Sequence, residues 1–65
     1  MMPSPVRFAE IRNLMEKNGW RLDRVRGSHH VFEKPGHRPF PIPVHNGKVH
    51  YGYYRKIQKD LADGN

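Results

Sequence analysis

The stretch WRLDRVRGSHHVFEKP, residues 20–35, decides the fold of this 65-residue chain. Two runs with β-forming residues, 20–26 and 29–35, lie on either side of Gly27-Ser28. Short β-prone runs that flank a glycine-containing break predict a β-hairpin. We expect the rest of the chain to pair with this hairpin or to pack against it.

The length of the hairpin loop determines which side chains share a face of the sheet. A two-residue loop would place Trp20 and Leu22 on the face of His29. A three-residue loop with a glycine bulge would place them on the face of Phe32. We predict the second arrangement, because it gathers three large apolar side chains on one buried face, to which His30 also turns. The opposite, solvent-facing side would carry His29, Val31 and Val25.

The run PFPIPVH, residues 39–45, alternates proline with apolar residues. Proline has no N–H to donate to a β-ladder, so within a sheet it belongs on an edge strand. Because all three prolines have the same parity, their missing donors point the same way, out of the sheet. This pattern predicts a third strand at a sheet edge protected against further pairing. The prolines are Pro39, Pro41 and Pro43.

Helical periodicity occurs near both ends of the chain. The first predicted helix covers residues 5–18, with Ser4 as its cap, Pro5 at its first position and Asn18-Gly19 as its end. The second covers residues 51–62. Their apolar stripes are Phe8, Ile11, Leu14 and Met15 in the first, and Tyr54, Ile57 and Leu61 in the second.

The predicted order is therefore helix, three strands, helix, within a single domain of residues 1–65. Strands grouped together between helices are typical of an α+β fold. We predict a three-stranded antiparallel sheet with two helices on one face. The other face stays open and is available to a ligand.

Composition limits the function. The chain carries 12 Lys and Arg against 6 Asp and Glu, a net charge of +6. Such a charge suits nucleic acid, an acidic protein or an anionic membrane surface, although it can also simply keep a protein soluble. The absence of cysteine excludes disulfides and thiolate zinc sites. No apolar run approaches the roughly 18 residues of a membrane span, and no signal-peptide pattern is found, so we expect a cytoplasmic location.

Five histidines raise the question of a metal. Adjacent strand residues point to opposite faces, so His29 and His30 are poorly placed to chelate one ion, and no recognisable ligand spacing is present. We therefore predict neither a metal nor another cofactor. The remaining histidines are His37, His45 and His50.

Acid–base chemistry is the alternative use of histidine, because its unperturbed pKa of about 6.5 lets it take and give a proton near neutrality. RNA carries its own nucleophile, the 2′-OH, so a small ribonuclease needs only a base and cations for the phosphate. A histidine beside Gly27-Ser28, flanked by Arg24 and Arg26, fits this need. From the residues alone, a surface hairpin with incidental histidines is an equally good interpretation.

A family resemblance favours the first interpretation. NGWRLDRVRGSHHVFEKP (residues 18–35), IPVHNGKV (42–49) and YGYYRKI (51–57) together resemble the HicA, or YcfA-like, toxins of bacterial HicAB toxin–antitoxin systems. The resemblance extends over about the whole chain. It implies a fold like a double-stranded-RNA-binding domain, arranged α-β-β-β-α. It also implies an mRNA interferase whose partners are mRNA and a HicB-type antitoxin that covers the active face.

The resemblance assigns catalysis to the histidine that directly follows Gly-Ser, which is His29 here. His45 matches the histidine of the family's Pro-x-His pattern and is a possible auxiliary residue, whereas His30 is expected to have a structural or supporting role. For RNA and phosphate binding we expect Arg24, Arg26, Ser28 and Lys48. A non-catalytic RNA-binding module and a protein-interaction domain remain the alternatives.

Overall fold

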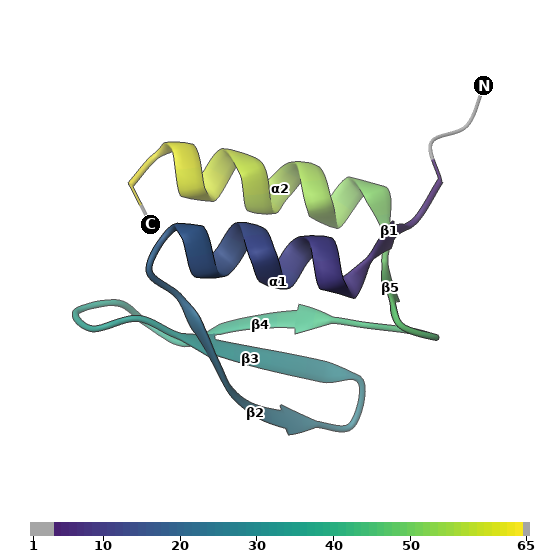
Figure 1. The fold of residues 1–65 in the computed structure, drawn as a ribbon, viewed down its shortest axis with the longest axis horizontal. Coiled ribbons are helices and arrows are strands. Elements are labelled where there is room, and N and C mark those ends of the chain that lie inside the picture. The colour runs from purple at the N-terminus through teal and green to yellow at the C-terminus, as the bar shows by residue number, and fades with distance from the viewer. Residues whose placement is uncertain (1–3, 65) are drawn as a thin grey trace.

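The fold is α+β, with both helices on one face of a three-stranded antiparallel sheet (Figure 1). The computed structural model describes residues 4–64. The sheet has the strand order β2-β3-β4, and two short strands, β1 and β5, form a separate ladder. The predicted architecture is confirmed, with this short ladder added. In chain order the elements are β1 (Val6–Arg7), α1 (Phe8–Lys17), β2 (Arg21–Arg26), β3 (His29–Glu33), β4 (Phe40–Pro43), β5 (Lys48–Val49) and α2 (Tyr51–Ala62).

Helix α1 begins three residues later than predicted. Phe8 rather than Pro5 is its first residue, and Ser4 lies outside the helix. The N-cap is Arg7, whose side chain makes no capping hydrogen bond. The preceding residues form β1 instead, because they pair antiparallel with β5, more than 40 positions along the chain. The start of α1 is thus set by long-range strand pairing and not by the local capping residues Ser4 and Pro5.

The end of α1 and the whole of α2 follow the predictions. The Asn18 side-chain amide donates to the carbonyl of Leu14 at 2.8 Å, and Gly19 has φ +87°. Helix α2 has the predicted bounds. Both apolar stripes contribute to the core, which lies between the helices and the sheet. The buried core cluster is Ile11, Met15, Trp20, Phe32, Ile42, Val44, Val49 and Ile57.

The hairpin of β2 and β3 has a two-residue loop, so the predicted three-residue loop with a glycine bulge is wrong. Arg26 and His29 lie directly opposite each other, with Gly27 and Ser28 between them. Gly27 has φ +57°, and type II′ turns place glycine at this first loop position. The tight loop brings the last residue of β2 next to the first residue of β3.

The bulge lies inside β2 instead. Asp23 and Arg24 together face one residue of β3, Val31, so one of them is an extra residue in the ladder. An extra residue reverses the alternation of side chains along the rest of the strand. Even-numbered residues of β2 therefore lie on the packed face before the bulge and on the open face after it.

With this bulge, Leu22 and Phe32 still share the packed face, as predicted, although the bulge is not in the loop. Leu22 lies opposite Phe32 on the packed face, as expected from the need to bury both. Val25 lies opposite His30, so it is on the packed side, and its predicted place beside His29 is wrong. The register shift comes before Val25 rather than after it, which accounts for the difference.

Strand β4 is at the edge of the sheet, as its prolines predicted. The Val44 N–H donates to the carbonyl of Ser28 at 2.7 Å, so donors of the non-proline parity point toward β3. On the outer edge the carbonyl of Pro41 accepts a hydrogen bond from the Tyr53 hydroxyl of α2 at 2.9 Å. Helix α2 thereby satisfies an acceptor of the edge strand.

We expect Tyr53→Phe to lower the melting temperature by about 2–12 °C, because a hydrogen bond of about 0.5–1.5 kcal/mol is removed from a small domain. Thermal unfolding followed by circular dichroism measures the shift. Tyr51→Phe is the matched control, since among residues 4–64 the Tyr51 hydroxyl makes no hydrogen bond. Equal effects of the two changes would contradict a stabilising role for the contact with Pro41.

Candidate functional site

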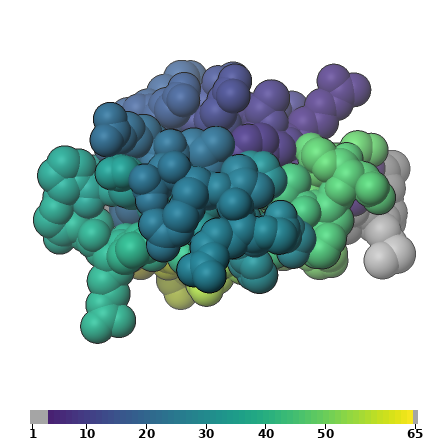
Figure 2. All heavy atoms as spheres, turned by 90° about the horizontal axis from the view of Figure 1, so that it is seen from below, coloured from purple at the N-terminus to yellow at the C-terminus, as the bar shows by residue number. Residues whose placement is uncertain are grey.

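The face of the sheet turned away from the helices is open, and Figure 2 looks directly onto it. His29 is exposed on this face, at the start of β3. Its cross-strand neighbours are Arg26 in β2 and Pro43 in β4. Directly opposite residues have Cβ atoms about 4.5–5.5 Å apart, so the imidazole and the Arg26 guanidinium are within reach of one common ligand.

The bulge in β2 is what places the arginines beside this histidine. In an unbroken strand, Arg24 and Arg26 would share the face of Leu22, which is packed against the core. The extra residue turns both arginines to the open face, in register with Val31 and His29. The structure thus brings together three of the side chains expected at the site.

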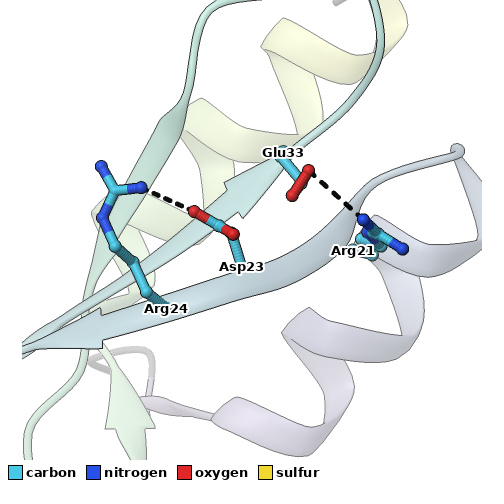
Figure 3. A network of polar contacts seen from close by, with 4 residues as sticks. All are labelled: Arg21, Asp23, Arg24 and Glu33. Atoms are coloured by element: carbon cyan, nitrogen blue, oxygen red, sulfur yellow. Dashed lines mark hydrogen bonds and ion pairs between the residues drawn. The ribbon is translucent and has the colours of Figure 1, made fainter.

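Arg24 differs from Arg26 in having an acidic partner. Its guanidinium lies 2.6 Å from the Asp23 carboxylate (Figure 3). Neighbouring residues of a regular strand point to opposite faces, and the bulge allows this pair to meet. Both side chains are more than a third exposed, and exposed ion pairs contribute only about 0–1 kcal/mol, so a phosphate could displace the carboxylate.

Ser28 lies in the turn before His29 and is half-buried. Its carbonyl accepts the Val44 N–H, which ties the turn to the chain leaving β4. This bond restrains the turn from the side opposite β2. The backbone that carries His29 is therefore held from both neighbouring strands.

His30 is in a different environment from His29, as predicted. It is half-buried on the packed face, and its ring lies 4.4 Å from the ring of Phe8, centroid to centroid. Its Nδ1 is buried and has no hydrogen-bond partner among the described residues. Packing against α1 thus holds a ring that does not face the open surface.

His45 and Lys48 flank a second tight turn, at the same end of the sheet as the Gly27-Ser28 turn (Figure 1). The two residues exchange backbone hydrogen bonds of 2.9 and 3.0 Å. The intervening Asn46 and Gly47 have φ +54° and +73°, and positive φ at both positions defines a type I′ turn. The expected site residues outside the strands thus lie in or beside tight turns: Ser28 in the first and His45 beside the second.

Within residues 4–64, no group of three or more metal-ligating side chains lies together. No helix in that part of the chain is both long and apolar enough to cross a membrane.

A hollow of about 480 Å³ lies at the end of the sheet away from the Gly27-Ser28 turn. It is formed by the β3–β4 connection and α2, and its lining includes Trp20, His37, Arg38, Tyr53 and Lys56. Because the β3–β4 connection follows the far end of β3 from His29, this hollow is not part of the candidate site.

The comparison with known families agrees with the motifs. Residues 8–62 match the family described as "HicA toxin of bacterial toxin-antitoxin". The chain belongs to the HicA toxin family. Searches of curated proteins and of solved structures each returned no match. As a HicA protein, the chain is the toxin of a toxin–antitoxin system, and its partner is an antitoxin.

Sequence reasoning missed one cation near the HicA site, Arg7. Its Cα is paired with that of Lys48 across the β1–β5 ladder. The predicted helix from Pro5 would have placed Arg7 on a helix surface. The pairing of β1 with β5, which the sequence reasoning did not foresee, brings it next to Lys48 instead. Nothing local to residues 4–8 indicates that ladder.

Proposed function

We propose that this HicA toxin is an mRNA interferase, an endoribonuclease that cuts transcripts in the cytoplasm without a metal ion or cofactor. The observation that carries the proposal is the position of His29. It is exposed on the open face, directly opposite Arg26, at the end of a tight turn. A general base beside a cation is enough for RNA cleavage, because RNA supplies the nucleophile.

In the proposed reaction, a ring nitrogen of His29 takes the proton from a ribose 2′-OH. The 2′-oxygen attacks the adjacent phosphorus, and the bond between phosphorus and the 5′-oxygen of the next nucleotide breaks. The leaving oxygen takes up a proton. The products are a 2′,3′-cyclic phosphate, which water can open to a 3′-phosphate, and a 5′-hydroxyl.

The cations have their role in the transition state, where negative charge on the phosphate increases. Arg26 is the best placed, since it is directly opposite His29. Arg24, after exchange of Asp23, is assigned a further contact with this phosphate, with the Ser28 hydroxyl as another donor. Lys48 is assigned a contact with the phosphate backbone of the RNA beside it. His45 is the candidate for an auxiliary proton donor. His30 supports the site through its packing on α1.

The antitoxin partner is proposed to be HicB-type and to cover the open face. Its binding would place protein over His29 and Arg26, the two residues that the substrate needs. Inhibition by coverage requires no change in the fold of the toxin.

Cleavage in EDTA with mapping of the product ends tests the proposal. We expect a transcript to yield 5′-hydroxyl ends and cyclic or 3′-phosphate ends. A matched RNA with 2′-deoxyribose at the mapped site should remain intact at that site, because it has no nucleophile there. Cutting of the deoxy-substituted RNA at the same position would contradict the 2′-OH mechanism.

The same experiment separates the alternatives. A protein that retards the transcript on a gel but never cuts it is a non-catalytic RNA-binding module. A protein that neither binds nor cuts RNA is better explained as a protein-interaction domain. A fall in RNA affinity with rising salt would identify phosphate contacts in either RNA-binding case.

A further inference from the structure

The β1–β5 ladder places two cations directly opposite each other. Arg7 and Lys48 are cross-strand partners, and both are exposed. Like charges at directly opposite positions destabilise a β-ladder. Neither side chain has an acidic partner among the described residues. The free protein therefore keeps an unrelieved repulsion within a ladder of only two residue pairs.

Two histidines extend this pair. His45 lies opposite Lys48 on its other side, and the type I′ turn fixes that arrangement. His50 is two residues after Lys48, while the intervening Val49 is fully buried, so alternation turns His50 outward as well. We call Arg7, Lys48, His45 and His50 the cationic row.

The hydrogen bond made by the His50 ring leaves its other nitrogen available to an anion. Its Nδ1 accepts a hydrogen bond from the Gly52 N–H at 3.0 Å, capping α2. An accepting Nδ1 places the proton of the neutral ring on Nε2, which makes that atom a donor. The hollow beside the row, of about 310 Å³, is lined by Pro5, His45, Asn46, Lys48 and His50, with no carboxylate among them.

We infer that the cationic row is a second phosphate subsite, which binds a phosphodiester next to the one at His29. This inference rests on the proposed RNA substrate. His29 lies opposite Pro43, and His45 is two residues further along, about 7 Å in strand geometry. The row thus continues directly from the candidate catalytic residue, and it sets the direction of the RNA across the open face.

An RNA backbone fits the row better than an acidic protein does. Protein interfaces have a core enriched in aromatic residues and methionine and depleted of charge. The outward side chains of the row are all cationic or imidazole donors. Among the described residues, the large hydrophobic side chain left exposed is Val25, which lies on the other face of the sheet.

The substitution Arg7→Glu tests the subsite, because it moves stability and affinity in opposite directions. Pairing Glu with Lys48 removes the repulsion, so the melting temperature at low salt should rise by about 1–4 °C. Affinity for a short single-stranded 2′-O-methyl RNA should fall about tenfold, and the salt slope should flatten by about 0.7 for each phosphate that the variant no longer neutralises. A folding defect would lower both quantities. Fluorescence anisotropy and thermal unfolding give the two readouts.

Lys17→Glu is the matched control. It makes the same charge change at the far end of α1, about 15 Å along the helix axis. We expect its affinity to change by less than about twofold, with an unaltered salt slope. Equal weakening by both substitutions, or no weakening by Arg7→Glu, would overturn the subsite. Polyglutamate that binds as tightly as RNA and responds equally to Arg7→Glu would overturn it in favour of an acidic protein partner.

The 2′-O-methyl probe keeps this test separate from the proposed function. It has no 2′-OH, so it cannot be cut by the proposed reaction whichever residue is the base. If Arg7→Glu behaves as expected while unmodified RNA is never cleaved, the subsite stands and the interferase proposal falls. If RNA is cleaved while Arg7→Glu binds the probe as tightly as the wild type, only the subsite falls.

Discussion

His29→Ala is expected to lower the rate of RNA cleavage by about 10²–10⁴-fold, the contribution typical of a general base. The fold should persist, because His29 is exposed and lies outside the core cluster. Single-turnover cleavage of a labelled transcript in EDTA measures the rate, and thermal unfolding checks the fold. In cells, the variant should no longer arrest growth at equal expression and should still bind the antitoxin.

His30→Ala is the informative neighbour for comparison. Its ring packs on Phe8 of α1. Removing the ring loses an aromatic contact of about 0.5–1.5 kcal/mol, so the melting temperature should fall. Below that temperature the folded fraction should cleave RNA at close to the wild-type rate. A His29→Ala protein that cuts within a factor of about ten of the wild type would rule out His29 as the general base.

Deletion of Val31 is expected to leave the domain largely unfolded at 25 °C. Removing one residue from β3 would turn the fully buried Phe32 to the open face and bring Glu33 to the packed face. Loss of a buried phenylalanine alone costs about 3–5 kcal/mol. A chain of this length has a total stability of about 3–10 kcal/mol. Circular dichroism and a denaturant titration would show that the cooperative transition has disappeared.

Deletion of Asp23, across the ladder from Val31, should be tolerated. Asp23 and Arg24 face one residue, so removing Asp23 turns β2 into a regular strand and moves no side chain to the other face. The ion pair with Arg24 that this deletion removes is exposed and contributes about 0–1 kcal/mol. Loss of the cooperative unfolding transition in the Asp23 deletion as well would show that the bulge itself is required for folding.

The bulge also connects the fold to the chemistry of this HicA toxin. Trp20 and Leu22 are needed in the core, and the arginines at 24 and 26 have the same parity in sequence. A regular strand could not bury the first pair and expose the second pair on the face of His29. One extra residue resolves this conflict at the cost of a local irregularity in the ladder.

The sequence by itself determined the features that depend on local alternation and on strong apolar signals. The prolines of residues 39–43 predicted the edge strand, and the spacing of Tyr54, Ile57 and Leu61 predicted helix α2. The short motifs within residues 18–35, 42–49 and 51–57 together indicated the family. These signals are carried by residues close together in the chain. They do not depend on which distant segment becomes a neighbour.

The tertiary structure alone decided the start of α1, the position of the β2 bulge and the cationic row. Each depends on pairing between segments that local propensity cannot choose, because a bulge at Asp23 and one at the Gly27-Ser28 loop bury the same apolar residues. Burial of Leu22 against Phe32 is satisfied by either bulge, and only the full ladder selects between them. Likewise Arg7 meets Lys48 only because Val6 and Val49, 43 residues apart, pair in the β1–β5 ladder.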